Sequence, residues 1–188
     1  MTSARVLLPH PARRRDLWQV DLAIAAIVIR NGPSHTEVML TPNGQCTVIE
    51  IGARIGAGHL GFLVQHALGI DPWAACLDTA LGLPAQLTPS RNSYATVRFL
   101  TAPRPGRLVS VTGLPDRSPQ VPIIRVRTAA GAIVNGTQDN TGRLGNIVVV
   151  GPDRHTVDQY ANDLLTQVRI DAEPHPAAQP LTSQRDSR

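Results

Sequence analysis

The spacing of hydrophobic residues changes along the chain and predicts a series of distinct elements. Apolar residues recur every three or four positions from Leu17 to Ile27, which predicts a helix that Asn31-Gly32-Pro33 ends. Two strand-like runs follow, at residues 36–41 and 46–51. The period then returns to that of a helix over residues 59–68, with Gly69 as its stop.

A third helix is expected from Asp71-Pro72, an N-cap followed by a first-turn proline, to about Gly82. Residues 84–92 are typical of a linker. Beyond the linker, short runs rich in Val and Ile predict strands at 94–100, 108–112, 123–128, 132–134 and 147–150. Gly151-Pro152-Asp153 then opens a final helix that carries apolar residues on one face.

The elements together predict an α+β protein with two structured parts. The first, residues 16–90, combines an antiparallel hairpin with helices, and the second, residues 91–170, is a β-rich lobe with a C-terminal helix. Residues 1–15 and 171–188 are expected to be disordered tails, because they are rich in Pro, Ala, Ser or Arg and show no period.

Charge and composition restrict the possible functions. Hydrophobic residues make up 42% of the 188 residues, which is enough to bury a core. All 18 basic residues are arginine, so any chemistry that needs a phosphate-binding or Schiff-base lysine from this chain is excluded. The net charge of +4 could indicate a nucleic-acid partner, but the arginines are scattered and form no basic helix face. That interpretation would need salt-sensitive retention on nucleic acid that is lost without residues 1–15.

Cys46 and Cys76 have no disulfide or metal-site spacing, which favours a reducing compartment, and we expect the cytoplasm. The apolar run 22–29 is too short to span a bilayer, so no membrane partner is expected.

The hairpin carries the candidate chemistry. If Asn43-Gly44 forms a two-residue loop, residues whose numbers sum to 87 are paired, and Glu37 then lies opposite Glu50. His35, Met39, Val48, Gly52 and Arg54 would share their face. Opposed carboxylates with a nearby arginine suit Mg²⁺ or Mn²⁺ held together with phosphate oxygens. The pairing alone fits an exposed hairpin with two solvated acids equally well.

The residues that flank these acids resemble a known family. The segments Gly32-Pro33-Ser34-His35-Thr36-Glu37 and Val48-Ile49-Glu50-Ile51-Gly52-Ala53-Arg54-Ile55-Gly56 are similar to the last part of an ATP-grasp domain. The sequence pattern most resembles that of the carboxylate–amine ligases of the L-amino-acid (dipeptide) ligase type, which are related to biotin carboxylase. The resemblance extends over about residues 17–170 and includes Leu68-Gly69-Ile70-Asp71-Pro72 and Arg143-Leu144-Gly145.

The resemblance implies an ATP- and Mg²⁺-dependent ligase that forms an acyl phosphate from a small carboxylate and transfers it to an amine. In the family's motifs, the positions of Glu37 and Glu50 hold metal ligands. The position of Arg54 holds the residue that contacts the acyl phosphate or the substrate carboxylate. From its place beside Glu37, His35 is a candidate to hydrogen-bond a phosphate or to orient Glu37, although a packed strand histidine is the simpler interpretation. The resemblance implies further substrate contacts at Gly56, Gly58 and His59. Arg143, between Gly142 and Gly145, is a candidate to reach the same site, although a solvated arginine is the simpler interpretation.

The family has parts that this sequence lacks. Its first ATP-grasp lobe supplies lysines to the phosphates, and many members carry Asn where this chain has Gly52. We therefore expect a fragment of a ligase or a misassigned start. The alternative is a non-catalytic remnant that forms a homodimer or binds a chain carrying the missing lobe.

Overall fold

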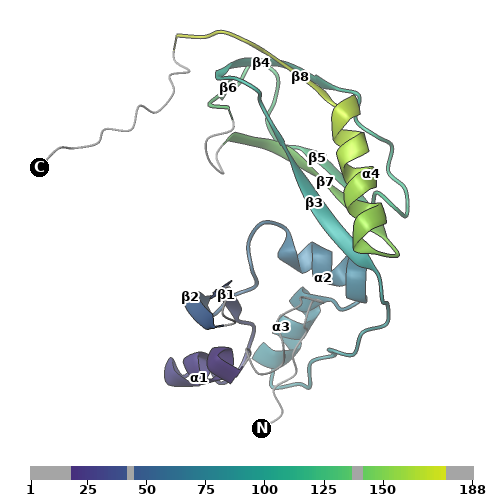
Figure 1. The fold of residues 1–188 in the computed structure, drawn as a ribbon. Helices are drawn as coiled ribbons and strands as arrows, with labels where there is room; N and C mark the ends of the chain where they lie inside the picture. The colour runs from purple at the N-terminus through teal and green to yellow at the C-terminus, as the bar shows by residue number, and fades with distance from the viewer. Residues whose placement is uncertain (1–17, 42–44, 137–141, 177–188) are drawn as a thin grey trace, which may run out of the picture. The chain divides into compact units, whose positions relative to one another are not determined.

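The computed structural model describes residues 18–41, 45–136 and 142–176 (Figure 1). The chain divides into two compact units, residues 1–92 (unit 1) and 93–188 (unit 2). Each unit combines helices with antiparallel strands, so the predicted α+β class is confirmed. The predicted tail over residues 1–15 lies outside the described residues.

The described residues of unit 1 form one hairpin and three short helices (Figure 1). In chain order they are α1 (Trp18–Ala26), β1 (His35–Leu40), β2 (Cys46–Gly52), α2 (Leu60–Leu68) and α3 (Pro72–Ala80). All five were expected from the sequence, and α1 packs beside β2.

The ends of these helices follow local chemistry. Helix α2 ends where Gly69 adopts a φ of +70° and donates its N–H to the carbonyl of Gln65, as the glycine predicts. The Asp71 carboxylate accepts from the N–H groups of Trp73 and Ala74 and so starts α3, as predicted. Helix α1 ends at Ala26, before the predicted stop at residues 31–33, because the chain turns at Val28 with a φ of +60°.

The described residues of unit 2 form two three-stranded sheets and one helix (Figure 1). The first sheet has the order β3-β7-β5 and the second β6-β4-β8. The elements are β3 (Tyr94–Thr101), β4 (Gly106–Thr112), β5 (Ile123–Val126), β6 (Ile133–Val134), β7 (Arg143–Gly151), α4 (Arg154–Gln167) and β8 (Arg169–Glu173).

Strand β8 corrects one prediction. Residues from 171 onward were expected to be disordered, but 171–173 pair with β4, and Ala172 lies fully in the core. Ile170 and Ala172 alternate with polar neighbours, a two-residue period that is too short to stand out beside the Pro- and Ala-rich sequence that follows. Residues 177–188 lie outside the described part of the chain.

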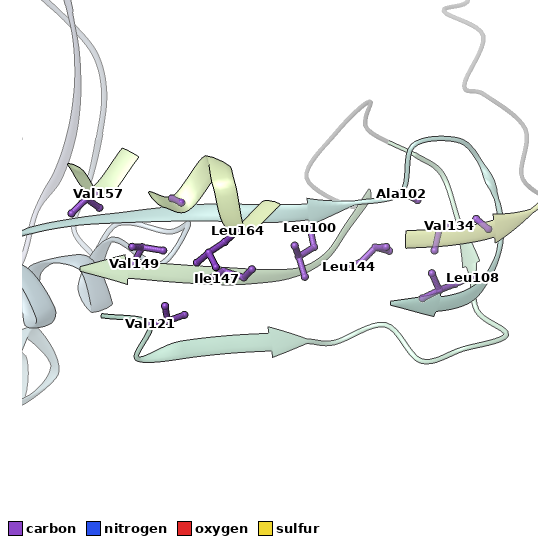
Figure 2. Close-up of a cluster of buried hydrophobic side chains, with 12 residues drawn as sticks. Leu100, Ala102, Leu108, Val121, Val134, Leu144, Ile147, Val149, Val157 and Leu164 are labelled. Atoms are coloured by element: carbon purple, nitrogen blue, oxygen red, sulfur yellow. The ribbon is translucent and has the colours of Figure 1, made fainter. Parts of the chain in front are cut away.

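The hydrophobic core cluster of unit 2 is continuous across both sheets and α4 (Figure 2). Helix α4 contributes Val157, Ala161 and Leu164, the face that the sequence predicts, and these pack with Leu100, Ile147 and Val149 from β3 and β7. The Asp153 side chain starts the helix by accepting from the N–H of Thr156 at 2.9 Å.

An ion pair fastens α4 to the sheet. Arg98 of β3 donates from Nη2 to Asp158 Oδ1 at 2.9 Å and from Nε to Asn162 Oδ1 at 3.1 Å. Partial burial opposes ionisation of Asp158, but hydrogen bonds from Arg98 and Arg154 outweigh it and lower the pKa of this carboxyl below its usual value.

Candidate functional site

Glu37 and Glu50 are direct partners across the hairpin. Their Cα atoms pair in the antiparallel register of β1 and β2, as do His35 with Gly52 and Thr36 with Ile51. Directly paired residues place their Cβ atoms about 5 Å apart on one face of the ladder. Both glutamate side chains are more than half exposed, at 56% and 54%, so the two carboxylates are open to a ligand.

The pairing nearer the loop differs from the prediction. The register shifts beyond Glu37, so that Val38 pairs with Val48 and Met39 with Thr47, leaving Ile49 without a partner. This β-bulge moves Val48 to the face opposite the acids, so the placement of Val48 beside them was wrong. Thr41 and Gln45 exchange hydrogen bonds, and three residues lie between them. The predicted Asn43-Gly44 loop itself falls outside the described residues.

His35 is held between Glu37 and Gly56. Its Nε2 lies 3.1 Å from Glu37 Oε1, and its side chain is only 17% exposed. A Cβ on Gly56 would lie 2.8 Å from His35 Nδ1, so only glycine allows this approach. The position fits a histidine that orients Glu37 while packing against the following loop.

Arg54 folds back over the end of β2 toward the second acid. Its Nη2 lies 3.3 Å from Glu50 Oε1, and its side chain is about half exposed. A Cβ on Gly52 would lie 3.2 Å from Arg54 Nε. The space beside Gly52 is therefore occupied by the arginine side chain.

The glycine-rich segment leads into α2. Gly58 and His59 both adopt left-handed backbone conformations, with φ of +66° and +69°, immediately before the helix. His59 is the N-cap residue of α2, and its side chain does not cap the helix. A Cβ on Gly56 would meet both Leu60 of α2 and His35 of β1, so the start of α2 and the hairpin pack together around this glycine.

Arg143 is part of unit 2 and is not grouped with these residues. It begins β7, and its guanidinium carbon lies 3.7 Å from the centre of the Phe99 ring on β3. The stacking on Phe99 gives Arg143 a defined position within unit 2.

Comparison with known proteins identifies the fold. Residues 98–173 match the family model described as L-amino acid ligase C-terminal domain 2. The L-amino acid ligase from Bacillus licheniformis superposes with a TM-score of 0.74 at 22% identity, over 89% of this chain and 43% of that one. Phosphoribosylglycinamide synthetase from Anaerococcus prevotii gives 0.75 at 16% identity, over 88% and 44%. The chain has the fold of the C-terminal part of an ATP-grasp ligase.

A third solved structure of the same fold contains a nucleotide. The biotin carboxylase domain of Hydrogenobacter thermophilus 2-oxoglutarate carboxylase, in complex with MgADP, gives a TM-score of 0.64 at 16% identity, over 90% of this chain and 38% of that one. The chain thus spans less than half the length of each of these ATP-grasp proteins. A search of curated protein sequences finds no match.

The donor set of the ATP-grasp hairpin fits Mg²⁺ bound together with phosphate. Across residues 18–41, 45–136 and 142–176, no group of three or more His, Cys, Asp or Glu side chains could hold a metal ion. Two paired carboxylates are what the hairpin offers. Mg²⁺ is commonly held by one or two carboxylates plus substrate phosphates and water, so the residues present fit a nucleotide-dependent ion and not a closed protein cage.

One polar residue in the ATP-grasp fold escaped the sequence analysis. Asn146, in the central strand β7 between Phe99 and Arg125, is 1% exposed, and its side-chain nitrogen and oxygen have no hydrogen-bond partner. A single polar residue before the apolar run 147–150 was the available signal.

In the described part of the chain, no helix is long and apolar enough to cross a membrane.

Proposed function

We propose that this chain supplies the metal-binding hairpin of an ATP-dependent carboxylate–amine ligase, working on an amino acid or similar small carboxylate in the cytoplasm. The observation that carries the proposal is the direct pairing of Glu37 with Glu50, with both carboxylates exposed and on one face. Like charges placed directly opposite each other are destabilising, and a shared cation removes that cost.

Glu37 and Glu50 would hold Mg²⁺, or Mn²⁺ in its place, and the ion would neutralise charge on the ATP phosphates. The Arg54–Glu50 ion pair is exposed on both sides and therefore weak, so Arg54 is released to an incoming anion at little cost. Its planar guanidinium suits a carboxylate or an acyl phosphate. His35 would orient the Glu37 carboxylate through its hydrogen bond.

The reaction proposed is that of the matched ligases. A carboxylate oxygen of the substrate attacks the γ-phosphorus of ATP, the bond to the β-phosphate oxygen breaks, and ADP leaves. The amine nitrogen of the second substrate then attacks the acyl carbon, and inorganic phosphate and the amine proton leave. Most of the rate enhancement in such a reaction comes from positioning the reactants and neutralising their charge. The hairpin residues would perform both tasks. The proposed substrate contacts are Gly56, Gly58, His59 and Arg143.

Phosphate release from ATP in the presence of amino-acid pairs tests this proposal. The assay compares the chain, combined with a nucleotide-binding ATP-grasp lobe, with the same mixture carrying Glu50→Gln. We expect metal-dependent release that this substitution abolishes. Turnover that survives Glu50→Gln would show that the metal assignment is wrong.

A second candidate function is a non-catalytic binding role for the same fold. The observation that favours it is the amount of apolar surface that unit 1 leaves exposed. A chain that binds a partner lobe but supports no phosphate release in this assay would have this role.

A further inference from the structure

Asn146 lies on the face of the sheet β3-β7-β5 that is turned away from helix α4. On the opposite face, Leu100, Ile147 and Val149 pack with the helix in the hydrophobic core cluster (Figure 2). Side chains alternate between the two faces along a strand, so Asn146, the neighbour of Ile147 on β7, points away from the helix. We call the sheet face that carries Asn146 the back face.

The back face has a polar row beside an apolar row. Phe99, Asn146 and Arg125 are direct partners across β3, β7 and β5, so their side chains lie next to one another. The adjacent row consists of Val97, Val148 and Ile123. Val148 is fully buried, although it does not belong to the core cluster under α4. A ligand on this face would therefore meet polar groups in one row and apolar groups in the next.

Arg143 brings a second guanidinium to the polar row. It pairs with Thr101, two residues beyond Phe99 on β3, and its guanidinium carbon lies 3.7 Å from the centre of the Phe99 ring. The side chain of Arg143 is half-buried, and that of Arg125 is exposed. A cation stacked on a ring at a partly exposed site is held weakly, so Arg143 can turn to a ligand at little cost. Asn146 thus has one arginine on its β5 side and another stacked on its β3 partner.

The amide of Asn146 indicates what kind of ligand the back face would take. The residue is 1% exposed, and within the described residues neither its Nδ2 nor its Oδ1 has a hydrogen-bond partner. Nδ2 carries two N–H donors and Oδ1 is an acceptor, and both lose the hydrogen bonds that they make to water in the unfolded chain. A ligand that satisfies this amide must offer an acceptor and a donor side by side. The two neighbouring guanidinium groups favour an anionic acceptor, and their planar shape matches a carboxylate.

We propose that the back face binds a small carboxylate that carries an N–H group beside its carboxyl group, as a free amino acid and the C-terminal residue of a peptide both do. Its carboxylate would accept hydrogen bonds from Asn146 Nδ2 and from the guanidinium groups of Arg125 and Arg143. Its N–H would donate to Asn146 Oδ1, and a short apolar side chain would pack on Val148. The inference rests on the proposed function only for Arg143, which it supplies with a ligand group, and no residue of unit 1 takes part.

A titration of the full chain, followed by nuclear magnetic resonance of the Asn146 side-chain amide, tests this inference. The amide signals are assigned by their absence from the spectrum of Asn146→Leu. The probes are alanine, which represents a free amino acid, and N-acetylalanine, which represents a peptide end, and propionate is the control without an N–H group. Neither ATP nor Mg²⁺ is present. We expect alanine or N-acetylalanine to shift the amide signals saturably, and propionate to bind at least about tenfold more weakly.

Variants of the polar row show whether its side chains form the site. Calorimetry with the stronger probe should show binding at least about tenfold weaker for Asn146→Leu, Arg125→Ala and Arg143→Ala, each made separately. Arg169→Ala is the matched control, because Arg169 is an exposed arginine on β8 of the other sheet. This control should bind within about twofold of the parent chain. Thermal melting of each variant would verify that it is folded.

Four outcomes would overturn the inference. They are amide signals that respond to neither alanine nor N-acetylalanine, propionate binding as tight as that of these probes, unchanged affinity in a folded Asn146→Leu variant, or an equal loss of affinity in Arg169→Ala. The proposed function fails separately. A chain that binds a probe on the back face but no metal at Glu37 and Glu50 would contradict the proposed function alone. A chain with an intact metal site and no response of Asn146 would contradict this inference alone.

Discussion

Glu37 pairs with Glu50 across the hairpin, and the next pair toward the loop, Val38 with Val48, skips Ile49. Three residues separate Thr41 from Gln45, one more than in the expected two-residue loop, and one residue bulges from β2. The extra residue near the loop and the bulged residue therefore compensate each other in the register of the strands. The bulge restores the alignment of the two acids. Bulges often redirect side chains beside functional sites, and here the bulge precedes the proposed metal ligand directly.

Deleting one residue from either strand tests this register. Deletion of Ile49 removes the bulge but keeps Glu37 opposite Glu50, so we expect Mn²⁺ affinity within a few-fold of the parent chain. Deletion of Val38 moves Glu37 opposite Val48 and should abolish that binding. Both side chains are exposed, and circular dichroism would verify that each variant folds. Equal binding by the two variants would show that the acid pair is not the ligand set.

Arg54 should matter for ligand binding and hardly at all for stability. Arg54→Ala removes an ion pair exposed on both sides, so the free energy of unfolding should change by about 0.5 kcal/mol or less. If Arg54 contacts a phosphate or carboxylate, the same variant should weaken nucleotide or acyl-phosphate-analogue binding by about tenfold or more. Chemical denaturation and calorimetry give the two values. A variant that loses stability but keeps its affinity would place Arg54 in the fold and not in the site.

Asp158 makes the stability of unit 2 dependent on pH. The pKa of Asp158 in the folded chain lies below its ordinary value. The ionised carboxylate therefore contributes its full stabilisation above about pH 4, and this stabilisation disappears as the pH falls through the lowered pKa of the folded state. Asp158→Asn should cost about 1–2 kcal/mol at neutral pH, because Arg98 loses a charged partner. The difference between the parent chain and the variant should shrink on acidification. A pH-independent difference would indicate a packing effect.

Asn146 should be replaceable by an apolar residue with a gain in stability. A buried amide without partners costs about 1–3 kcal/mol, and leucine keeps the branching at Cγ, at a larger volume, without that cost. We expect Asn146→Leu to raise the melting temperature, whereas Asn146→Asp, which buries a charge, should lower it. A lower melting temperature for the leucine variant would mean that the amide has a bonding role in solution.

The sequence predicted elements wherever the signal was local. The Asp71-Pro72 start of α3, the Gly69 stop of α2 and the apolar face of α4 all depend on residues within one or two turns, and all are confirmed. The pairing of Glu37 with Glu50 was predicted correctly, but the pairs nearer the loop follow another register. The difference arises from the bulge at Ile49, which depends on backbone geometry that the residue types do not predict. The contact of Gly56 with His35 depends on tertiary packing and had no sequence signal.

The most direct measurement for the central claim is Mn²⁺ binding in the presence of ATP, followed by electron paramagnetic resonance. The parent chain is compared with Glu37→Gln, Glu50→Gln and, as a control acid on α4, Asp163→Asn. We predict that each glutamine variant weakens Mn²⁺ binding by at least about tenfold, since one of two carboxylate ligands is lost, while Asp163→Asn binds like the parent. Unchanged Mn²⁺ affinity in both glutamine variants would contradict the assignment of the hairpin as a metal site.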